Sequence, residues 1–202
     1  MTFVPGHVSV GRLVQRFMFP APLVSLLGVL RWGARISWRA EVEWTSNLQL
    51  GRRTTISSFA KVKTADGVFR TGRDCGFANG CFVAPGRAGI VLGDYVQCGP
   101  NVAIIGSNYI YAALEVPFEE QGASSIGVRI GRNVWIGANT TILDGSVIGD
   151  NTIIVANSLV NRRFPPNVIV QGNPAKIVLR RGPGEGESGG QGAGASARAE
   201  DR

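Results

Sequence analysis

The chain has 202 residues, 44% of them hydrophobic, which suits one compact domain with its own core better than two domains. Its formal net charge is +7; residues 182–202 hold two arginines and four acidic residues and contribute −2, which leaves +9 on the rest. A basic body favours anionic partners, among them phosphorylated small molecules, acidic lipid surfaces and nucleic acid, and charge alone does not choose between these.

Residues 1–35 form an apolar and basic segment. The most apolar stretch, residues 17–30, is interrupted by Pro20 and Pro22 and is shorter than the ~20 residues that span a bilayer. Arginines follow it in place of a small-residue cleavage site, so we expect neither a transmembrane helix nor a secretory signal. Two interpretations of residues 13–36 stay open: they cap the exposed end of the structure that follows, or they lie on an anionic membrane surface.

A six-residue repeat dominates residues 36–181. Six aliphatic residues occur at intervals of six, namely Ile130, Ile136, Ile142, Ile148, Ile154 and Val160. The fifth position of each unit is mostly small, with Val134, Thr140, Ser146, Thr152 and Ser158. A triangular coil needs one aliphatic side chain inside each face and small residues where the backbone turns, so three hexads complete one turn. The pattern predicts an all-β solenoid, a parallel β-helix.

The same template recurs upstream, with coils that start at positions 50, 71, 92, 130 and 148. The upstream trios are Leu50, Ile56 and Val62; Thr71, Phe77 and Val83; and Leu92, Cys98 and Ile104. Compared with a regular coil of three hexads, two of these coils are longer by three positions and one is longer by twenty, and this long insertion follows Ile104. An earlier trio, Ile36, Val42 and Leu48, keeps the spacing in a different phase and is a candidate first coil.

Two stretches carry a family resemblance. Residues 130–151 read IGRNVWIGANTTILDGSVIGDN, and a G-N-P-A-K element follows at 172–176. In these stretches, and more broadly over residues 48–181, the chain resembles the hexapeptide-repeat acyltransferases, especially the maltose, galactoside and xenobiotic acetyltransferase relatives among the sugar O-acetyltransferases. The resemblance implies a left-handed β-helix, a homotrimer with active sites between subunits, and acyl-CoA, expected to be acetyl-CoA, as donor, with no metal.

The resemblance also implies a CoA-binding set. By position it comprises Trp135 and Ala138 along the pantetheine arm, Ala156 further along, and Asn161, Arg162 and Lys176 at the nucleotide and phosphate end. A cationic side chain beside the loop 172–174 can meet phosphate charge while the loop backbone approaches closely. The alternative for Lys176 is a solvated surface lysine.

The family places a catalytic histidine in the long insertion, in a G-S-N-H pattern. Here residues 106–109 read Gly-Ser-Asn-Tyr, and the only histidine of the chain is His7, far upstream. One histidine also excludes the three-histidine zinc site of the γ-class carbonic anhydrases, which share the solenoid.

Four residues of the insertion are candidates to replace the histidine: Asn108, Tyr109, Glu119 and Glu120. A phenol is a much weaker base than an imidazole at neutral pH, so Tyr109 is expected to position rather than deprotonate. A glutamate within hydrogen-bond reach could take the acceptor's proton. With no base at all, an amine acceptor becomes more plausible than a hydroxyl. The alternative is that the insertion only packs against a neighbouring subunit.

We therefore expect an acyltransferase that moves an acyl group from CoA to a hydroxyl or amine of a sugar, or of a nucleotide- or lipid-linked sugar, in polysaccharide or glycoconjugate synthesis. Nucleic acid is not expected as a partner. The rival interpretation is a β-helix that binds but does not catalyse. Three cysteines without C-x-x-C spacing (Cys75, Cys81 and Cys98) are expected to be structural, in a cytoplasmic protein that is peripheral to the inner membrane face if residues 13–36 lie on lipid. Residues 182–202 are expected to be a disordered glycine-rich tail.

Overall fold

The structure is a computed structural model that describes residues 20–182. The expected glycine-rich tail, apart from its first residue, and the first half of the apolar, basic segment lie outside the described residues. Within residues 20–182, no helix is long and apolar enough to cross a membrane.

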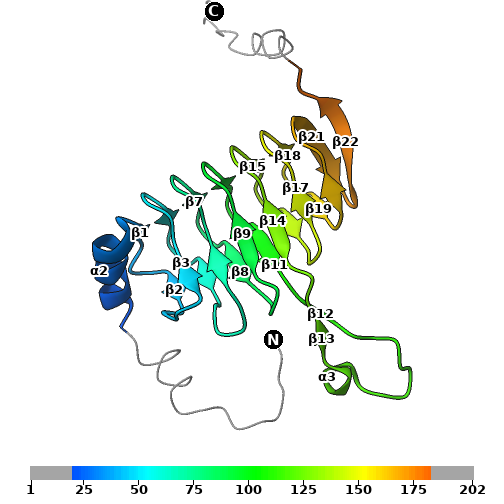
Figure 1. Cartoon of the computed structure of the whole chain (residues 1–202), viewed down its shortest axis with the longest axis horizontal. Coiled ribbons are helices and arrows are strands. Elements are labelled where there is room, and N and C mark those ends of the chain that lie inside the picture. The colour runs from blue at the N-terminus through cyan, green and yellow to red at the C-terminus, as the bar shows by residue number, and fades with distance from the viewer. Residues whose placement is uncertain (1–19, 183–202) are drawn as a thin grey trace, which may run out of the picture.

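Three sheets of very short strands form the three faces of a prism (Figure 1), and the predicted left-handed parallel β-helix is confirmed. Face A contains β1 (Arg35–Ile36), β4 (Thr55–Ile56), β7 (Gly76–Phe77), β10 (Gln97–Cys98), β15 (Trp135–Ile136), β18 (Ile153–Ile154), β21 (Val168–Gly172) and the antiparallel β22 (Ala175–Arg180). Face B contains β2 (Glu41–Val42), β5 (Lys61–Val62), β8 (Phe82–Ala84), β11 (Ala103–Ile105), β16 (Thr141–Ile142) and β19 (Leu159–Val160). Face C contains β3 (Leu48–Gln49), β6 (Phe69–Arg70), β9 (Ile90–Leu92), β14 (Val128–Ile130), β17 (Val147–Ile148) and β20 (Arg163–Phe164).

The aliphatic residues of the six-residue repeat fill the interior. Ile104, Ile136, Ile142 and Ile154 are completely buried, and each stacks on its counterparts in the neighbouring coils. The small residues predicted for the turns are buried too, as Thr140 shows. Many of the turns also need a residue at positive φ, which asparagine accepts more readily than most side chains. The C-terminal coils supply it with Asn133, Asn139, Asn151, Asn157 and Asn167.

The register confirms the predicted insertions and locates them at one corner, between faces B and C. Ile104 pairs with Ile142 directly, so the long insertion that separates them in the chain leaves the ladder unbroken. The candidate first coil is confirmed, because Ile36 and Val42 stack in the same columns as Ile56 and Val62. Its phase in the sequence differs because 20 residues, which is not a multiple of six, separate the members of each pair.

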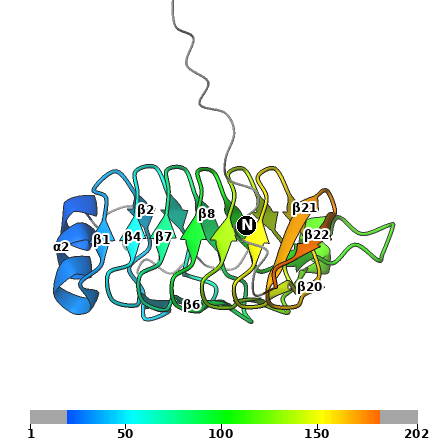
Figure 2. The same ribbon diagram turned by 90° about the horizontal axis from the view of Figure 1, so that it is seen from above.

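A helix covers the N-terminal end of the solenoid (Figures 1 and 2). This helix, α2 (Ala21–Trp32), begins after Pro20 with Pro22 in its first turn, a position that suits proline, and ends at Gly33 at a φ of 60°. Val24 and Gly28 face the first coil, where a Cβ on Gly28 would lie 2.8 Å from Cδ1 of Ile36. A Cβ here would displace the end of the Ile36 side chain, so glycine lets the helix backbone lie close to the end of the core.

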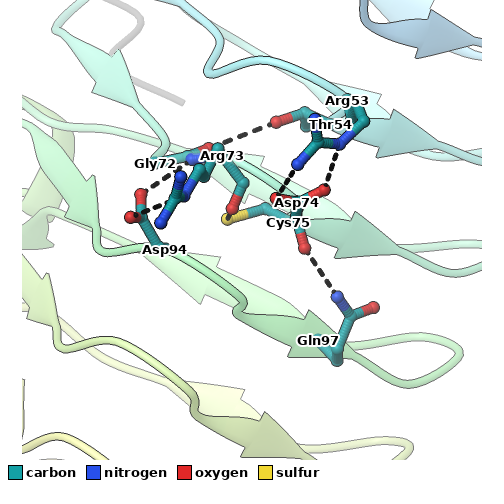
Figure 3. Close-up of polar contacts among 8 residues, drawn as sticks. All are labelled: Arg53, Thr54, Gly72, Arg73, Asp74, Cys75, Asp94 and Gln97. Carbon is teal, nitrogen blue, oxygen red and sulfur yellow. Dashed lines mark hydrogen bonds and ion pairs between the residues drawn. The ribbon is translucent and has the colours of Figure 1, made fainter.

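The corner between faces C and A carries a ladder of arginine–aspartate pairs (Figure 3). The Arg53 guanidinium donates from Nε and Nη2 to both carboxylate oxygens of Asp74, at 2.6 and 2.7 Å. Arg73 pairs with Asp94 on the next coil at 3.2 Å. These exposed pairs join successive turns of the solenoid on its outer surface, whereas the stacked aliphatic side chains join them in the interior.

Candidate active site

The long insertion, residues 106–127, leaves the solenoid at the corner between faces B and C (Figure 1). Its stem is a two-residue antiparallel ladder in which β12 (Asn108–Tyr109) pairs with β13 (Ala123–Ser124). The short helix α3 (Phe118–Gln121) lies beyond the stem and packs against β12. Every residue from 108 to 120 is exposed, so the loop is held by its base and its own hydrogen bonds rather than by the core.

Asp144 and Ser125 fasten the base of the loop to the solenoid. The buried Asp144 carboxylate accepts the backbone N–H of Ile126 at 2.9 Å and that of Gly127 at 2.7 Å. The Ser125 hydroxyl donates to the Gly106 carbonyl at 2.6 Å, which joins the two ends of the loop. The exit and re-entry of the chain are thereby fixed, although the residues between them are exposed.

One glutamine shapes the tip. The Gln121 side chain accepts the N–H of Ala113 at 3.0 Å and donates to the carbonyls of Ala113 and Val116, both at 2.7 Å. This folds residues 111–118 around a shallow hollow with large apolar side chains exposed beside it. Leu114 is 94% exposed and Tyr111 74%, which is unusual for side chains of this kind.

The four catalytic candidates share this loop. Asn108 and Tyr109 lie on the stem and are exposed, Tyr109 to 40%. Glu119 and Glu120 form the first turn of α3 and are exposed as well. Since α3 packs against β12, the carboxylates and the phenol belong to one small unit that is open to solvent.

Four of the six CoA-binding candidates lie on face A or at its corner with face B. Trp135 projects from β15 and is 59% exposed. Ala138 and Ala156 occupy the same corner on consecutive coils, where the N–H of Asn157 donates to the Ala138 carbonyl at 2.9 Å. The β21–β22 turn bends over this corner, because the Gly172 N–H donates to Ser158 Oγ at 3.1 Å, and Lys176 follows it, exposed.

Asn161 and Arg162 lie elsewhere. They follow β19 at the corner between faces B and C, the corner from which the long loop leaves, and Arg162 Nε donates to the Asn161 side-chain oxygen at 3.4 Å. One chain therefore arranges the candidates at two corners separated by face B, with the catalytic candidates at one and most of the CoA-binding candidates at the other.

The cysteines offer no nucleophile. All three are free and buried. Burial raises the pKa of Cys75 to about 11, that of Cys81 above its ordinary value and that of Cys98 well above it, so each thiol stays protonated at neutral pH. Cys75 and Cys81 occupy small-residue turn positions as expected, but Cys98 lies in the ladder between Phe77 and Ile136.

Part of the solenoid is similar to known proteins. The family model "Bacterial transferase hexapeptide (six repeats)" matches residues 127–162, which begin at the base of the loop and include five of the six CoA-binding candidates and none of the four catalytic candidates. Over these residues the chain is similar to the hexapeptide-repeat transferases. Galactoside O-acetyltransferase of Escherichia coli (strain K12) is 36% identical over 90 residues, which are 44% of this chain and 43% of the relative. The chain spans about half the length of the curated relatives it matches.

Two solved structures show the same hexapeptide-repeat fold. AntD, an N-acyltransferase from Bacillus cereus in complex with dTDP and 3-hydroxybutyryl-CoA, superposes with a TM-score of 0.69 at 20% identity and covers 81% of this chain and 89% of its own. The hexapeptide-repeat acetyltransferase VCA0836 from Vibrio cholerae O1 biovar eltor, complexed with acetyl coenzyme A, has a TM-score of 0.54 at 20% identity and covers 86% and 90%.

Within this hexapeptide-repeat chain, the residues that hold the loop escape sequence inspection. Asp144, Ser125 and Gln121 were not candidates, because each acts on backbone groups, which any residue type supplies. The repeat pattern gave no signal for Asp144, because the same position of other hexads holds exposed residues such as Arg132 and Arg162.

Proposed function

We propose that the chain is a CoA-dependent acyltransferase that transfers an acyl group, acetyl in the simplest case, to a hydroxyl or amine of a sugar. One observation carries the proposal: within residues 20–182, a hexapeptide solenoid with an otherwise unbroken ladder extrudes one long, exposed loop, fastened at its base and open at its stem. Such a loop does not contribute to the core, so its ordered base is better explained by a task outside the core.

In the proposed reaction, the acceptor oxygen or nitrogen bonds to the thioester carbonyl carbon, the carbon–sulfur bond breaks, and the acceptor's proton ends on the CoA sulfur. Trp135, Ala138 and Ala156 would line the pantetheine arm, and Lys176 would meet phosphate charge. Asn108 and Tyr109 would orient the acceptor, and Glu119 or Glu120 would take its proton. Orientation alone supplies part of the rate enhancement.

The proposal includes a homotrimer. The catalytic and CoA-binding candidates lie at two corners of the same prism, so a neighbouring chain is the natural means to bring a loop of one subunit to the CoA corner of another. The exposed Tyr111, Leu114 and Phe118 at the loop tip support this, because a neighbouring subunit would bury them.

The tyrosine at position 109, where the resemblance expects histidine, bears on the acceptor. An amine attacks a thioester with less help from a base than a hydroxyl does, and AntD is an N-acyltransferase crystallised with dTDP. The galactoside O-acetyltransferase relatives support a hydroxyl. We therefore propose a nucleotide-linked or glycoside sugar as acceptor, in polysaccharide or glycoconjugate synthesis. The same tyrosine supports the second candidate function, a β-helix that binds CoA without turnover.

Incubation of the full chain with acetyl-CoA and a panel of sugars, amino sugars and nucleotide sugars separates the two candidates. The expected result is acceptor-dependent release of free thiol, measured with a thiol reagent; the chain's own buried cysteines contribute little background, since their raised pKa keeps them protonated. CoA binding by calorimetry with no thiol released from any acceptor would instead establish the non-catalytic candidate.

Substitutions in the loop test the assigned roles. Tyr109→Phe is expected to lower kcat about tenfold, because it removes one orienting hydroxyl. Glu119→Gln or Glu120→Gln should lower it about a hundredfold at whichever position takes the proton. Tyr95→Phe, an exposed tyrosine on another corner, is the control. Unchanged rates in all three loop variants would reject this site.

A further inference from the structure

The outer side of the capping helix α2 is apolar. Its inner side contacts the first coil through Val24 and Gly28. The helical repeat turns Leu23, Leu26, Val29 and Leu30 to the opposite side, where they are 40%, 55%, 52% and 72% exposed. An ordinary surface helix turns its apolar stripe to the core and its polar side to water. In α2 the larger apolar side chains point outward, and we call these four residues the cap face.

Arginines without acidic neighbours lie at the end of the capping helix and on the first coil beneath it. Arg31, Arg35 and Arg39 are exposed, and residues 20–40 contain no aspartate or glutamate. The first acidic residue, Glu41, already pairs with Lys61 and Lys63. This end of the solenoid therefore carries positive charge that no acidic side chain of residues 20–40 compensates.

Tryptophans accompany two of these arginines. Arg31 lies over the ring of Trp32 at 4.9 Å, and Arg39 over that of Trp38 at 4.8 Å. Trp38 is 62% exposed, on the turn between β1 and β2 of the coil that the helix covers. Tryptophan and arginine side chains combine an apolar body with a polar end, which suits the boundary between lipid chains and headgroups.

Charge distinguishes between the occupants that could cover this face. A second copy in a two-fold arrangement would set the same arginines against each other. Residues 1–19 of the chain contain Arg12 and Arg16 and no acidic residue, so they would not neutralise the face. An anionic lipid surface supplies both a layer for the four apolar side chains and negative charge for the arginines.

We propose that the cap face docks onto an anionic lipid bilayer, with α2 in the plane of the headgroups and Arg31, Arg35 and Arg39 bound to lipid phosphates. The contact is peripheral, because α2 has 12 residues, too few to span a bilayer. It involves an end of the solenoid that is distinct from the loop and the CoA corner, so it holds whether or not the chain is an acyltransferase.

Vesicle flotation with the full-length chain tests the proposal. We expect binding to vesicles of equal parts phosphatidylcholine and phosphatidylglycerol, little binding to pure phosphatidylcholine, and release at high salt. The double variant Leu26→Ser, Leu30→Ser should weaken binding at least about tenfold. The triple variant Arg31→Gln, Arg35→Gln, Arg39→Gln should weaken it about a hundredfold, since each arginine contributes about a factor of five.

Matched variants elsewhere isolate the face. Val178→Ser changes an apolar residue at the other end of the solenoid that is as exposed as Leu26. The triple variant Arg70→Gln, Arg129→Gln, Arg163→Gln removes three positive charges from face C, as many as the cap-face triple variant removes. Both control variants should bind vesicles like the parent. Wild-type binding by either cap-face variant would overturn the proposal. The proposal would also be overturned if the parent chain did not bind vesicles but self-associated in ultracentrifugation in a concentration-dependent way that the Leu26→Ser, Leu30→Ser variant abolished. A second copy of the chain would then be the occupant.

Discussion

The long loop and the coil that carries it differ in almost every physical respect. Ile104 and Ile142, on either side of the loop, are completely buried and pair as if nothing separated them. Leu114 at the loop tip is 94% exposed. The solenoid is therefore stabilised by side chains that the loop does not touch, and the loop can be altered at little cost to the fold. Stability and the proposed chemistry reside in different residues of the same coil.

The strongest test of this division between ladder and loop is to remove the loop. Replacing residues 106–127 with the sequence of residues 85–89 would shorten this coil to the length of the coil before it, with Ile105 and Val128 in the register of Ala84 and Ile90. We expect acyl transfer to fall by about a thousandfold or more, since the orienting groups are gone. The melting temperature should change by only a few degrees. Retained activity would remove the loop from the site.

A cavity in the ladder should have the opposite effect. Ile142→Ala empties a completely buried position between Ile104 and Val160 and is expected to lower the free energy of unfolding by about 3 kcal/mol. Ile126→Ala, at a position 71% exposed in the loop, is the control and should change it by less than about 0.5 kcal/mol. Urea unfolding at fixed protein concentration measures both. Equal losses would contradict the division between ladder and loop.

Asp144 joins the two regions, so its removal should affect both. Asp144→Ala leaves the buried N–H of Gly127, and that of Ile126, without their acceptor and is expected to cost about 2 kcal/mol of stability. Activity should fall about tenfold, because the base of the loop loosens. Asp66→Ala, an exposed acid on the corresponding turn of an earlier coil, should change neither quantity. A loss of stability with full activity would show that the loop does not need this anchor.

The sequence revealed the ladder because a periodic pattern reports a repeated environment. The alternation of Ile136, Thr140 and Ile142 was enough to predict buried faces and buried turns. The first coil was predicted correctly from Ile36 and Val42, although its pattern is out of phase in the sequence, because 20 residues separate these two from their partners in the next coil. The helix α2 was not predicted, since its apolar residues lie on the outside, where the usual amphipathic pattern does not apply.

The candidate site was less accessible to sequence reasoning. The loop was predicted from the enlarged interval between the coils that start at Leu92 and Ile130, and Asn108 and Tyr109 do lie on its stem. The stem pairing, the Gln121 turn and the Asp144 anchor depend on backbone groups, which carry no residue-specific signal. The separation of the candidates onto two corners follows from how the strands stack, and only the three-dimensional structure reveals it.

The smallest expected effect concerns the outer ladder of Figure 3, which belongs to neither the interior nor the loop. The hydrogen bonds from Arg53 hold the pKa of Asp74 below its ordinary value. The pair therefore stabilises the fold at any pH above the pKa that aspartate has in the unfolded chain. This stabilisation is lost as the pH falls through the lower pKa of Asp74 in the folded chain. Asp74→Asn should therefore lower the melting temperature slightly at neutral pH and not at all in strong acid. Arg53→Gln should give the same profile, and the double variant should add nothing further, because both changes remove one interaction. An effect that persisted in acid would mean that Asp74 acts through the backbone turn at its φ of 58° rather than through its charge.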